Sequence, residues 1–321
     1  MKLSDFVPPI LIKATRRMRG QALASFSDCD NDIQRLLLEV TNDPLRADLH
    51  CKLADAYASF GDRPSQQRAV ATYRTAITLG ASEGQLDAKL RALNDNLCGA
   101  DSIGLKAWSH NEYVRLTTVA EKVHSISGED ASVLDVGGAN GGLCFFLPNC
   151  RYALAEPQVN GIDGTDLPFV DHSFDVVSAS HVLEHIPTAR RSQFLDNLCR
   201  NASQHVLLLN PFIVADSYHE DRLQLVLDLT EAGWAKEHLE CGLPELDEVR
   251  QYASSRGISC QVVPNHCMTT SLALVFVEYY AHLAARSADL SKINELFNRY
   301  SLDQLTDATL PVGYLVHFEL T

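Results

Sequence analysis

The sequence contains no long hydrophobic run, and this absence argues against a membrane-spanning helix. Of 321 residues, 46% are hydrophobic, but the longest apolar stretch, residues 271–285, is interrupted by Glu278 and His282. It is shorter than the roughly 20 residues that a bilayer span requires. A second apolar patch, residues 6–12, contains two prolines and is not followed by a small-residue cleavage site, so we expect no secretory signal.

Positive charge is also scarce. Lys and Arg number 27 against 41 Asp and Glu, which gives a formal net charge of −14. A chain with this balance offers no broad basic surface to nucleic-acid phosphates, so we expect no nucleic-acid partner. The nine cysteines are odd in number and include no Cys-x-x-Cys pair, which argues against a disulfide framework or a zinc ribbon. They indicate a reduced, cytoplasmic protein.

Length and pattern predict two regions. At about 150 residues per domain, the chain has room for about two domains. We place an all-helical region at residues 1–100 and an α/β domain at residues 101–321. From residue 111 onward, helical and strand patterns alternate, which predicts a mostly parallel, doubly wound sheet.

Residues 1–20 differ from the rest of the chain, because five basic residues there stand against one acid, Asp5. The apolar residues between Ile10 and Met18 fall at helical spacing opposite the basic ones. Such a helix either lies on an anionic membrane surface or docks on the chain's own acidic domain.

One segment of the helical region resembles a single tetratricopeptide repeat. The matching residues are Leu53, Ala54, Tyr57, Gly61, Ala69, Tyr73 and Ala76. A lone repeat does not bury a continuous face, so we expect it to pack against the rest of the chain. The alternative is a surface for a protein partner or a second copy of the chain. The apolar stretch 272–285 is predicted to be core, with a dimer or membrane face as its alternative.

A glycine-rich turn follows the first predicted strand. Residues 132–136 run into Gly137-Gly-Ala-Asn-Gly-Gly142, and we expect a short apolar helix over 143–147. Glycines let the backbone turn tightly and approach a ligand, while a helix start presents free N–H groups. Because the middle position is Ala139, the turn alone is a weak signal for a dinucleotide.

Two segments resemble class I S-adenosylmethionine-dependent methyltransferases. Val133-Leu-Asp-Val-Gly-Gly-Ala-Asn-Gly141 resembles the first motif of that family, and residues 163–187 resemble its central segment. The resemblance covers residues 102–321. It implies a Rossmann-like, mostly parallel sheet with an antiparallel last strand, and S-adenosylmethionine as the cofactor.

The resemblance also implies the cofactor-binding residues. They are Asp135, Gly137, Gly138, Ala139, Gly141, Glu156, Asp163 and Gly164. The glycine turn would border the methionine part, Glu156 would accept from the ribose hydroxyls, and the last two residues would meet the adenine. Only six residues separate Glu156 from Asp163, so we expect a short crossover in place of the family's usual helix and third strand.

The predicted strand 174–180 delivers His181, Glu184 and His185 to the carboxyl edge of the sheet, where ligands bind in such folds. Methyl transfer to a hydroxyl requires an aligned nucleophile and removal of a proton. We therefore predict the two histidines as candidates for the base and Glu184 as the group that orients them. The alternative for His185 is packing at a helix start.

The same residues allow a metal alternative. His-x-x-Glu-His spells an inverted zinc-protease motif, but that motif requires a long helix and this segment follows a strand, which excludes it. The segment also resembles the Glu-x-x-Glu-His pattern that holds a divalent ion in ubiquinone-pathway O-methyltransferases. An ion held by His181, Glu184 and His185 is therefore an alternative, and the favoured interpretation has no metal.

The N-terminus carries the prediction of the acceptor. Phe6-Val-Pro-Pro-Ile-Leu11, followed by a basic helix, resembles bacterial methyltransferases for surface polysaccharides, including O-antigen. This implies O-methylation of a sugar, on a lipid-linked acceptor at the inner membrane face. The alternatives are a small-molecule or protein methyltransferase, or a non-catalytic module that binds the cofactor. Helices after Asp221 are expected to cover the acceptor, with His219 and His238 as surface residues and secondary base candidates.

Overall fold

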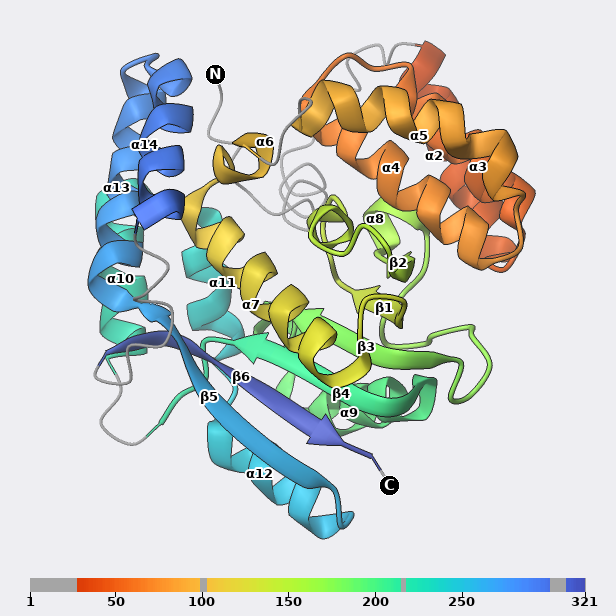
Figure 1. Cartoon of the computed structure of the whole chain (residues 1–321). Helices are drawn as coiled ribbons and strands as arrows, with labels where there is room; N and C mark the ends of the chain where they lie inside the picture. Colours follow the sequence, from red (N-terminus) through yellow and green to blue (C-terminus); the bar gives the residue numbers. More distant parts are fainter. Residues whose placement is uncertain (1–27, 99–102, 215–217, 301–309, 321) are drawn as a thin grey trace.

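The computed structural model describes residues 28–98, 103–214, 218–300 and 310–320 (Figure 1). The predicted basic helix within residues 1–20 and most of the predicted linker at 99–104 lie outside these ranges. Among the residues that the structure describes, no helix is long and apolar enough to cross a membrane.

Six strands form one sheet in the order β2-β1-β3-β4-β6-β5. The strands are β1 (Ser132–Val136), β2 (Arg151–Ala155), β3 (Phe174–Ser180), β4 (Ala202–Asn210), β5 (Ser259–Cys267) and β6 (Pro311–Glu319). The first four in chain order pair in parallel, and β6 runs antiparallel to both of its neighbours. The predicted fold class, a mostly parallel Rossmann-like sheet with an antiparallel last strand, is confirmed.

Helices cover both faces of this sheet. On one face lie α9 (Thr188–Asn201) and α12 (Leu246–Ser255), whose Leu198 and Val249 pack into an apolar cluster with the strands. The other face is covered by α7 (His110–Ser127), which is preceded by a short helix, α6 (Ile103–Lys106). Because both faces are covered, all five residues of β1 are buried. Its sequence therefore does not alternate between apolar and polar residues as that of a half-exposed strand does.

The helical region consists of α2 (Asp28–Asn42), α3 (Ala47–Ala58), α4 (Arg63–Thr78) and α5 (Glu83–Cys98). Helix α4 lies along β2, the edge strand of the sheet (Figure 1). The Leu154 N–H donates to Thr75 Oγ1 at 2.9 Å, and Thr78 Oγ1 donates to the Tyr152 carbonyl at 2.8 Å. Two threonine hydroxyls on a helix thus satisfy edge groups that another strand would otherwise pair.

Further hydrogen bonds fix the helical region to the α/β part. Tyr57 Oη donates to the Val159 carbonyl at 2.9 Å. The Arg74 guanidinium donates to the carbonyls of Leu147, at 2.7 Å, and Cys150, at 2.5 Å. The α3–α4 hairpin therefore packs against the chain's own sheet, as expected of a lone repeat. Its likeness to a tetratricopeptide repeat stays a prediction.

The connection between β2 and β3 is short, as predicted. A single helical turn, α8 (Pro157–Asn160), follows β2, and no strand occurs in the fully described stretch 156–173. Asn160 holds this turn in place, because its Oδ1 accepts from Glu156 N at 3.0 Å and its Nδ2 donates to the Leu154 carbonyl. The prediction of an apolar helix over 143–147 was wrong. The chain forms one 3₁₀ turn there, η2 (Gly142–Phe145).

Four helices lie near the carboxyl edge of the sheet or beside it. They are α10 (His219–Thr230), α11 (Gly233–Cys241), α13 (Met268–Leu283) and α14 (Ser287–Tyr300). The first three share an apolar cluster around Leu223 and Ala235. Helix α13 buries Leu274 but leaves Tyr280 52% and Leu283 64% exposed, so the core prediction for 272–285 holds for one face only.

The contact between α4 and β2 can be tested with two threonines of α4 that are both fully buried. Thr75→Val removes the acceptor of the Leu154 N–H, so we expect the free energy of unfolding in urea to fall by about 1–3 kcal/mol. Thr72→Val is the matched control, because Thr72 Oγ1 is buried without a partner, and its loss should be neutral or stabilising. Equal losses for both variants would contradict this role of Thr75.

Candidate functional site

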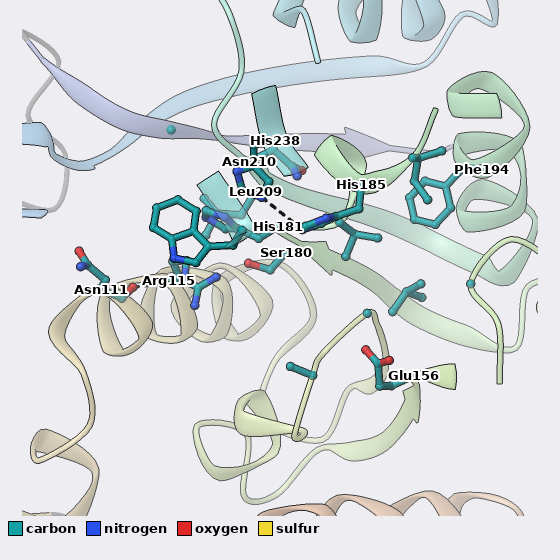
Figure 2. A pocket seen from close by; sticks show the side chains of 18 of the residues that line it. Asn111, Arg115, Glu156, Ser180, His181, His185, Phe194, Leu209, Asn210 and His238 are labelled. Carbon is teal, nitrogen blue, oxygen red and sulfur yellow. Dashed lines mark hydrogen bonds between the residues drawn. The ribbon is translucent and has the colours of Figure 1, made fainter. Parts of the chain in front are cut away.

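A cavity of about 560 Å³ opens at the carboxyl ends of β1, β3 and β4. Its size suits a small-molecule ligand, and its place is the edge where parallel sheets of this kind bind ligands. The glycine turn after β1 and the segment after β2 line one half. Polar residues from β3, β4, α7, α10 and α11 line the other half, where Figure 2 labels Arg115, His181, Asn210 and His238.

Two predicted glycines line the cavity at positions that accept no side chain. Gly137 has φ +71°, and a Cβ there would lie 2.4 Å from Val182 Cγ2. At Gly164 a Cβ would lie 2.5 Å from Val136 Cγ1 and 3.3 Å from the Phe194 ring. Both glycines therefore lie where the backbone packs closely against neighbouring side chains.

Ala139, Glu156 and Asp163 line the same half. Ala139 has φ +49°, a left-handed conformation that costs a residue with a Cβ about 1–2 kcal/mol. Glu156 caps α8, where its Oε1 accepts from Gln158 N at 3.3 Å, and burial raises its pKa. Asp163 is exposed, and its Oδ1 accepts from the backbone and side chain of Thr165, both at 2.8 Å.

The other three predicted cofactor residues do not line the cavity. Asp135 is 2% exposed and accepts from Tyr152 Oη at 2.7 Å, and burial raises its pKa to about 7. A Cβ on Gly138 would meet the Asp135 carboxylate, and one on Gly141 would meet Ala71 of α4. These three residues shape and support the turn.

The catalytic half centres on a carboxylate with no exposed surface, Glu184. It lies in a short 3₁₀ turn, η3 (Leu183–His185), directly after β3. His181 Nδ1 lies 3.1 Å from Glu184 Oε1, and Asn210 Nδ2 donates to Glu184 Oε2. The end of β3 and the end of β4 thus meet at one carboxylate.

Burial and neighbouring charges shift the pKa values of both Glu184 and His181. Burial favours the neutral form of Glu184, but the neighbouring His181 outweighs it and holds the pKa of Glu184 at about 2. Burial and the nearby Arg115 lower the pKa of His181, against the opposite effect of Glu184. At neutral pH the pair is therefore an ionised carboxylate beside a neutral imidazole.

His185 has different partners. Its Nδ1 lies 3.3 Å from Glu237 Oε1, and its Nε2 lies 3.3 Å from Nε2 of His238. Burial lowers the pKa of His185, but the contact with Glu237 more than compensates and the net shift is upward. Both ring nitrogens already face protein groups, whereas Nδ1 alone is engaged in His181.

The two histidines predicted at the surface are buried. His219 is 1% exposed and His238 is 6% exposed, so that prediction was wrong. Burial lowers the pKa of each to about 4, and His238 faces the cavity from α11. A helix that covers a cavity buries its inward side chains, and no local sequence pattern indicates what α10 and α11 pack against.

Within the described ranges, one group of side chains could hold a metal ion: Glu184, His185 and His238, whose ligand atoms all lie within 4.8 Å of one another. His238 takes the place that the sequence-based alternative gave to His181. Two residues of the chain face the Glu184 oxygens, His181 at Oε1 and Asn210 at Oε2.

Several residues of the cavity were not predicted: Asn111, Arg115, Ser180, Asn210, Arg222, Asn265 and His266. They come from β3, β4, β5, α7 and α10. Each lies in an ordinary amphipathic or strand pattern, so no local motif distinguishes it. The one available signal was Asn210 at the end of a predicted strand, a position that parallel sheets use for ligands.

Three non-glycine residues with positive φ line this one cavity: Ala139 at 49°, His181 at 57° and His266 at 59°. Backbone strain of this kind persists where the surrounding structure holds it, and it concentrates at functional sites. The strain and the perturbed pKa values together mark the cavity as the functional site.

Comparison with known proteins assigns the central segment. Residues 134–208 match the sequence model of the family described as "Methyltransferase domain". The match contains the glycine turn, the Asp163 segment and the His181 to His185 segment. The match supports a methyltransferase domain over this segment, and the cofactor predicted for that domain is S-adenosylmethionine.

No curated protein matches the chain. Among solved structures, YcgJ of Bacillus subtilis is 14% identical with a TM-score of 0.39 and covers 64% of this chain and 97% of its own. An S-adenosylmethionine-dependent methyltransferase of Thermotoga maritima is 11% identical with a TM-score of 0.41, over 68% of this chain and 99% of its own. Magnesium protoporphyrin IX methyltransferase of Synechocystis is 12% identical with a TM-score of 0.38, over 56% and 89%. Likenesses this small carry no inference about the acceptor.

The room beside Ala139 gives a test of the cofactor half. Ala139→Val puts a branched side chain at a left-handed position that faces the cavity, so we expect S-adenosylhomocysteine affinity to fall by about tenfold or more. Ala139→Gly relieves the strain and should keep or raise the affinity. Calorimetric titration measures both, and equal affinities for the valine variant and wild type would place the cofactor elsewhere.

Proposed function

We propose that the chain transfers the methyl group of S-adenosylmethionine to a hydroxyl of its acceptor, with His181 as the base. The observation that carries this proposal is the contact of His181 Nδ1 with the buried, ionised Glu184. A carboxylate in this position holds the imidazole in the form that has its proton on Nδ1. Nε2 is then left as the acceptor for a proton.

The two halves of the cavity divide the work. Gly137 and Ala139 would border the methionine part of the cofactor, Glu156 would accept from the ribose hydroxyls, and Asp163 with Gly164 would meet the adenine; all five line the cavity. When bound, the cofactor supplies a methyl group on a positively charged sulfur. This chain has to align the acceptor oxygen with that methyl and keep water out.

His181 Nε2 would accept the proton of the acceptor hydroxyl when the methyl group is transferred to that oxygen. The resulting imidazolium lies against Glu184, which stabilises it. Asn210 contributes twice: its Nδ2 holds Glu184, and its Oδ1 is buried without a hydrogen-bond partner at the cavity wall. We assign Asn210 Oδ1 to orienting the acceptor hydroxyl.

His185 acts as a positioning residue in this scheme. Its contacts with Glu237 and His238 connect η3 to α11, a helix that covers the cavity. If a divalent ion binds, Glu184, His185 and His238 would hold it, and it would supply positive charge beside the acceptor. The base remains His181 in either case.

The predictions of the acceptor, of membrane contact and of oligomer formation remain predictions. O-methylation of a sugar in a surface polysaccharide or O-antigen stays a prediction, and so does oligomer formation. Membrane contact through residues 1–20 also stays a prediction, because those residues lie outside the described part. A small-molecule acceptor is equally compatible with the cavity volume. A module that binds the cofactor without turnover is distinguished by whether S-adenosylhomocysteine forms with any hydroxyl acceptor.

Two histidine variants separate the base from the positioning residue. His181→Ala removes the proton acceptor, so we expect turnover to fall by about 10²–10⁴-fold with unchanged affinity for S-adenosylhomocysteine. His185→Ala should lower turnover by less than about tenfold, because its nitrogens face protein groups. The measurement is S-adenosylhomocysteine formation with a panel of hydroxyl acceptors, including O-antigen sugars. A larger loss in His185→Ala would reverse the assignment.

The pH dependence follows from the downward shift of the His181 pKa from its ordinary value of 6.5. A base works in its neutral form, so turnover should be level from pH 7 upward and fall about tenfold per pH unit below the His181 pKa. In Glu184→Gln the anion that favours protonation of His181 is lost, so the midpoint should move to lower pH while turnover falls. A wild-type midpoint above pH 6.5 would contradict the assignment.

A further inference from the structure

Arg222, on the covering helix α10, is a buried cation without a partner. It is 9% exposed and lines the cavity. Its guanidinium makes no hydrogen bond with any residue in the described ranges, and its Nε is buried without a partner. Burial lowers its pKa to about 10, so the group remains charged at neutral pH.

A buried charge of this kind is expensive unless it is paired. Removing an ion from water costs several kcal/mol, and proteins offset this cost with an opposite charge and hydrogen bonds. None of the ion pairs within 4.0 Å in the described chain includes Arg222 or Arg115. Because Arg222 lines the cavity, a ligand bound there can supply the partner that no residue of the described ranges supplies.

The pKa values of two histidines near Arg222 reflect its positive charge. Burial lowers the pKa of His266 to about 3, with His110, Arg222 and Arg115 adding to the shift. The pKa of His219 is lowered in the same way, mainly by burial and further by the charge of Arg222. The buried carboxylate of the same half, Glu184, faces His181 and Asn210.

The cofactor does not account for this charge. S-adenosylmethionine has one carboxylate, on its methionine part, and that carboxylate can pair with one guanidinium. Arg115 lies on α7, whose Glu112 side chain reaches within 3.3 Å of a Cβ built on Gly142, beside the glycine turn. Arg222 lies on α10 instead. The charged form of Arg115 is also favoured by two carboxylates of the chain, Glu112 and Glu184, whereas no carboxylate of the described residues does the same for Arg222. Arg222 is therefore the cation left for the acceptor.

We propose that Arg222 binds an oxyanion of the acceptor, so that the substrate is a hydroxyl compound with a carboxylate or phosphate group. A guanidinium holds such a group through two parallel N–H···O bonds. The acceptor would then present its anionic group to α10 and its hydroxyl to His181 and Asn210. This inference rests on the proposed function, because it assigns the substrate class to the same cavity.

The experiment is calorimetry on the full chain saturated with S-adenosylhomocysteine, so that the cofactor's own carboxylate site is filled. The probes are glucuronate, inorganic phosphate and, as the neutral match, glucose. We expect at least one oxyanion to bind and glucose not to bind measurably; the stronger of the two oxyanions identifies the group. Arg222→Gln should weaken oxyanion binding at least about tenfold and change S-adenosylhomocysteine affinity less than about twofold.

Two controls make the result specific. Arg250→Gln changes an exposed arginine of α12 that pairs with Asp247, and it should bind oxyanions as wild type does. Arg222→Lys keeps the charge without the fork, and it should bind them with intermediate affinity. Thermal unfolding checks that each variant is folded.

The outcomes separate the two claims. No oxyanion binding by wild type loaded with S-adenosylhomocysteine would overturn the inference and leave the proposed function standing. A loss of S-adenosylhomocysteine affinity in Arg222→Gln would also overturn it, because Arg222 would then belong to the cofactor. Failure of wild type to bind S-adenosylhomocysteine would instead contradict the proposed function.

Discussion

The site depends on a carboxylate that has no access to water. Glu184 stays ionised because His181 and two further histidines lower its pKa, while Asn210 donates to its Oε2. The parallel pairing of β3 with β4 brings His181 and Asn210 together, with Ser180 opposite Leu209. The backbone takes part as well: the His181 N–H donates to the Leu209 carbonyl at 2.8 Å, while His181 has φ +57°. The pairing of β3 with β4 and the contact with the buried Glu184 carboxylate together leave the His181 side chain little freedom to adopt another orientation. Pre-organisation of this kind is what a general base requires.

The helical region serves the same site from behind. With no strand beyond β2, the edge of the sheet would present free N–H and carbonyl groups, and α4 covers it with Thr75 and Thr78. The same helix reaches the glycine turn, since Arg68 Nε donates to Asn140 Oδ1 at 2.7 Å and Ala71 fills the space at Gly141. The short crossover leaves β2 at the edge of the sheet. The helical region covers this edge, and its helix α4 also contacts the glycine turn.

Much of the fold and half of the site could be predicted from the sequence, because their signals are local. Continuous apolar runs mark the buried parallel strands, the glycine turn marks the first strand end, and the six residues between Glu156 and Asp163 excluded another helix and strand. The His181 to His185 segment was found because it follows a strand directly. Arg115, Arg222 and Asn210 were not found, since their meeting depends on how α7, α10 and β4 pack, and nothing local records that. The 3₁₀ turn at 142–145 was mistaken for a helix because apolar residues alone do not fix helix length.

The central claim is that Glu184 leaves His181 with its proton on Nδ1 and a free Nε2. The most direct measurement is ¹⁵N NMR of the histidine side chains, with the His181 signals identified by their loss in His181→Ala. The account predicts a neutral ring at pH 7 with the proton on Nδ1 and an unprotonated Nε2. A ring that is protonated at pH 7, or a neutral ring with its proton on Nε2, would contradict it.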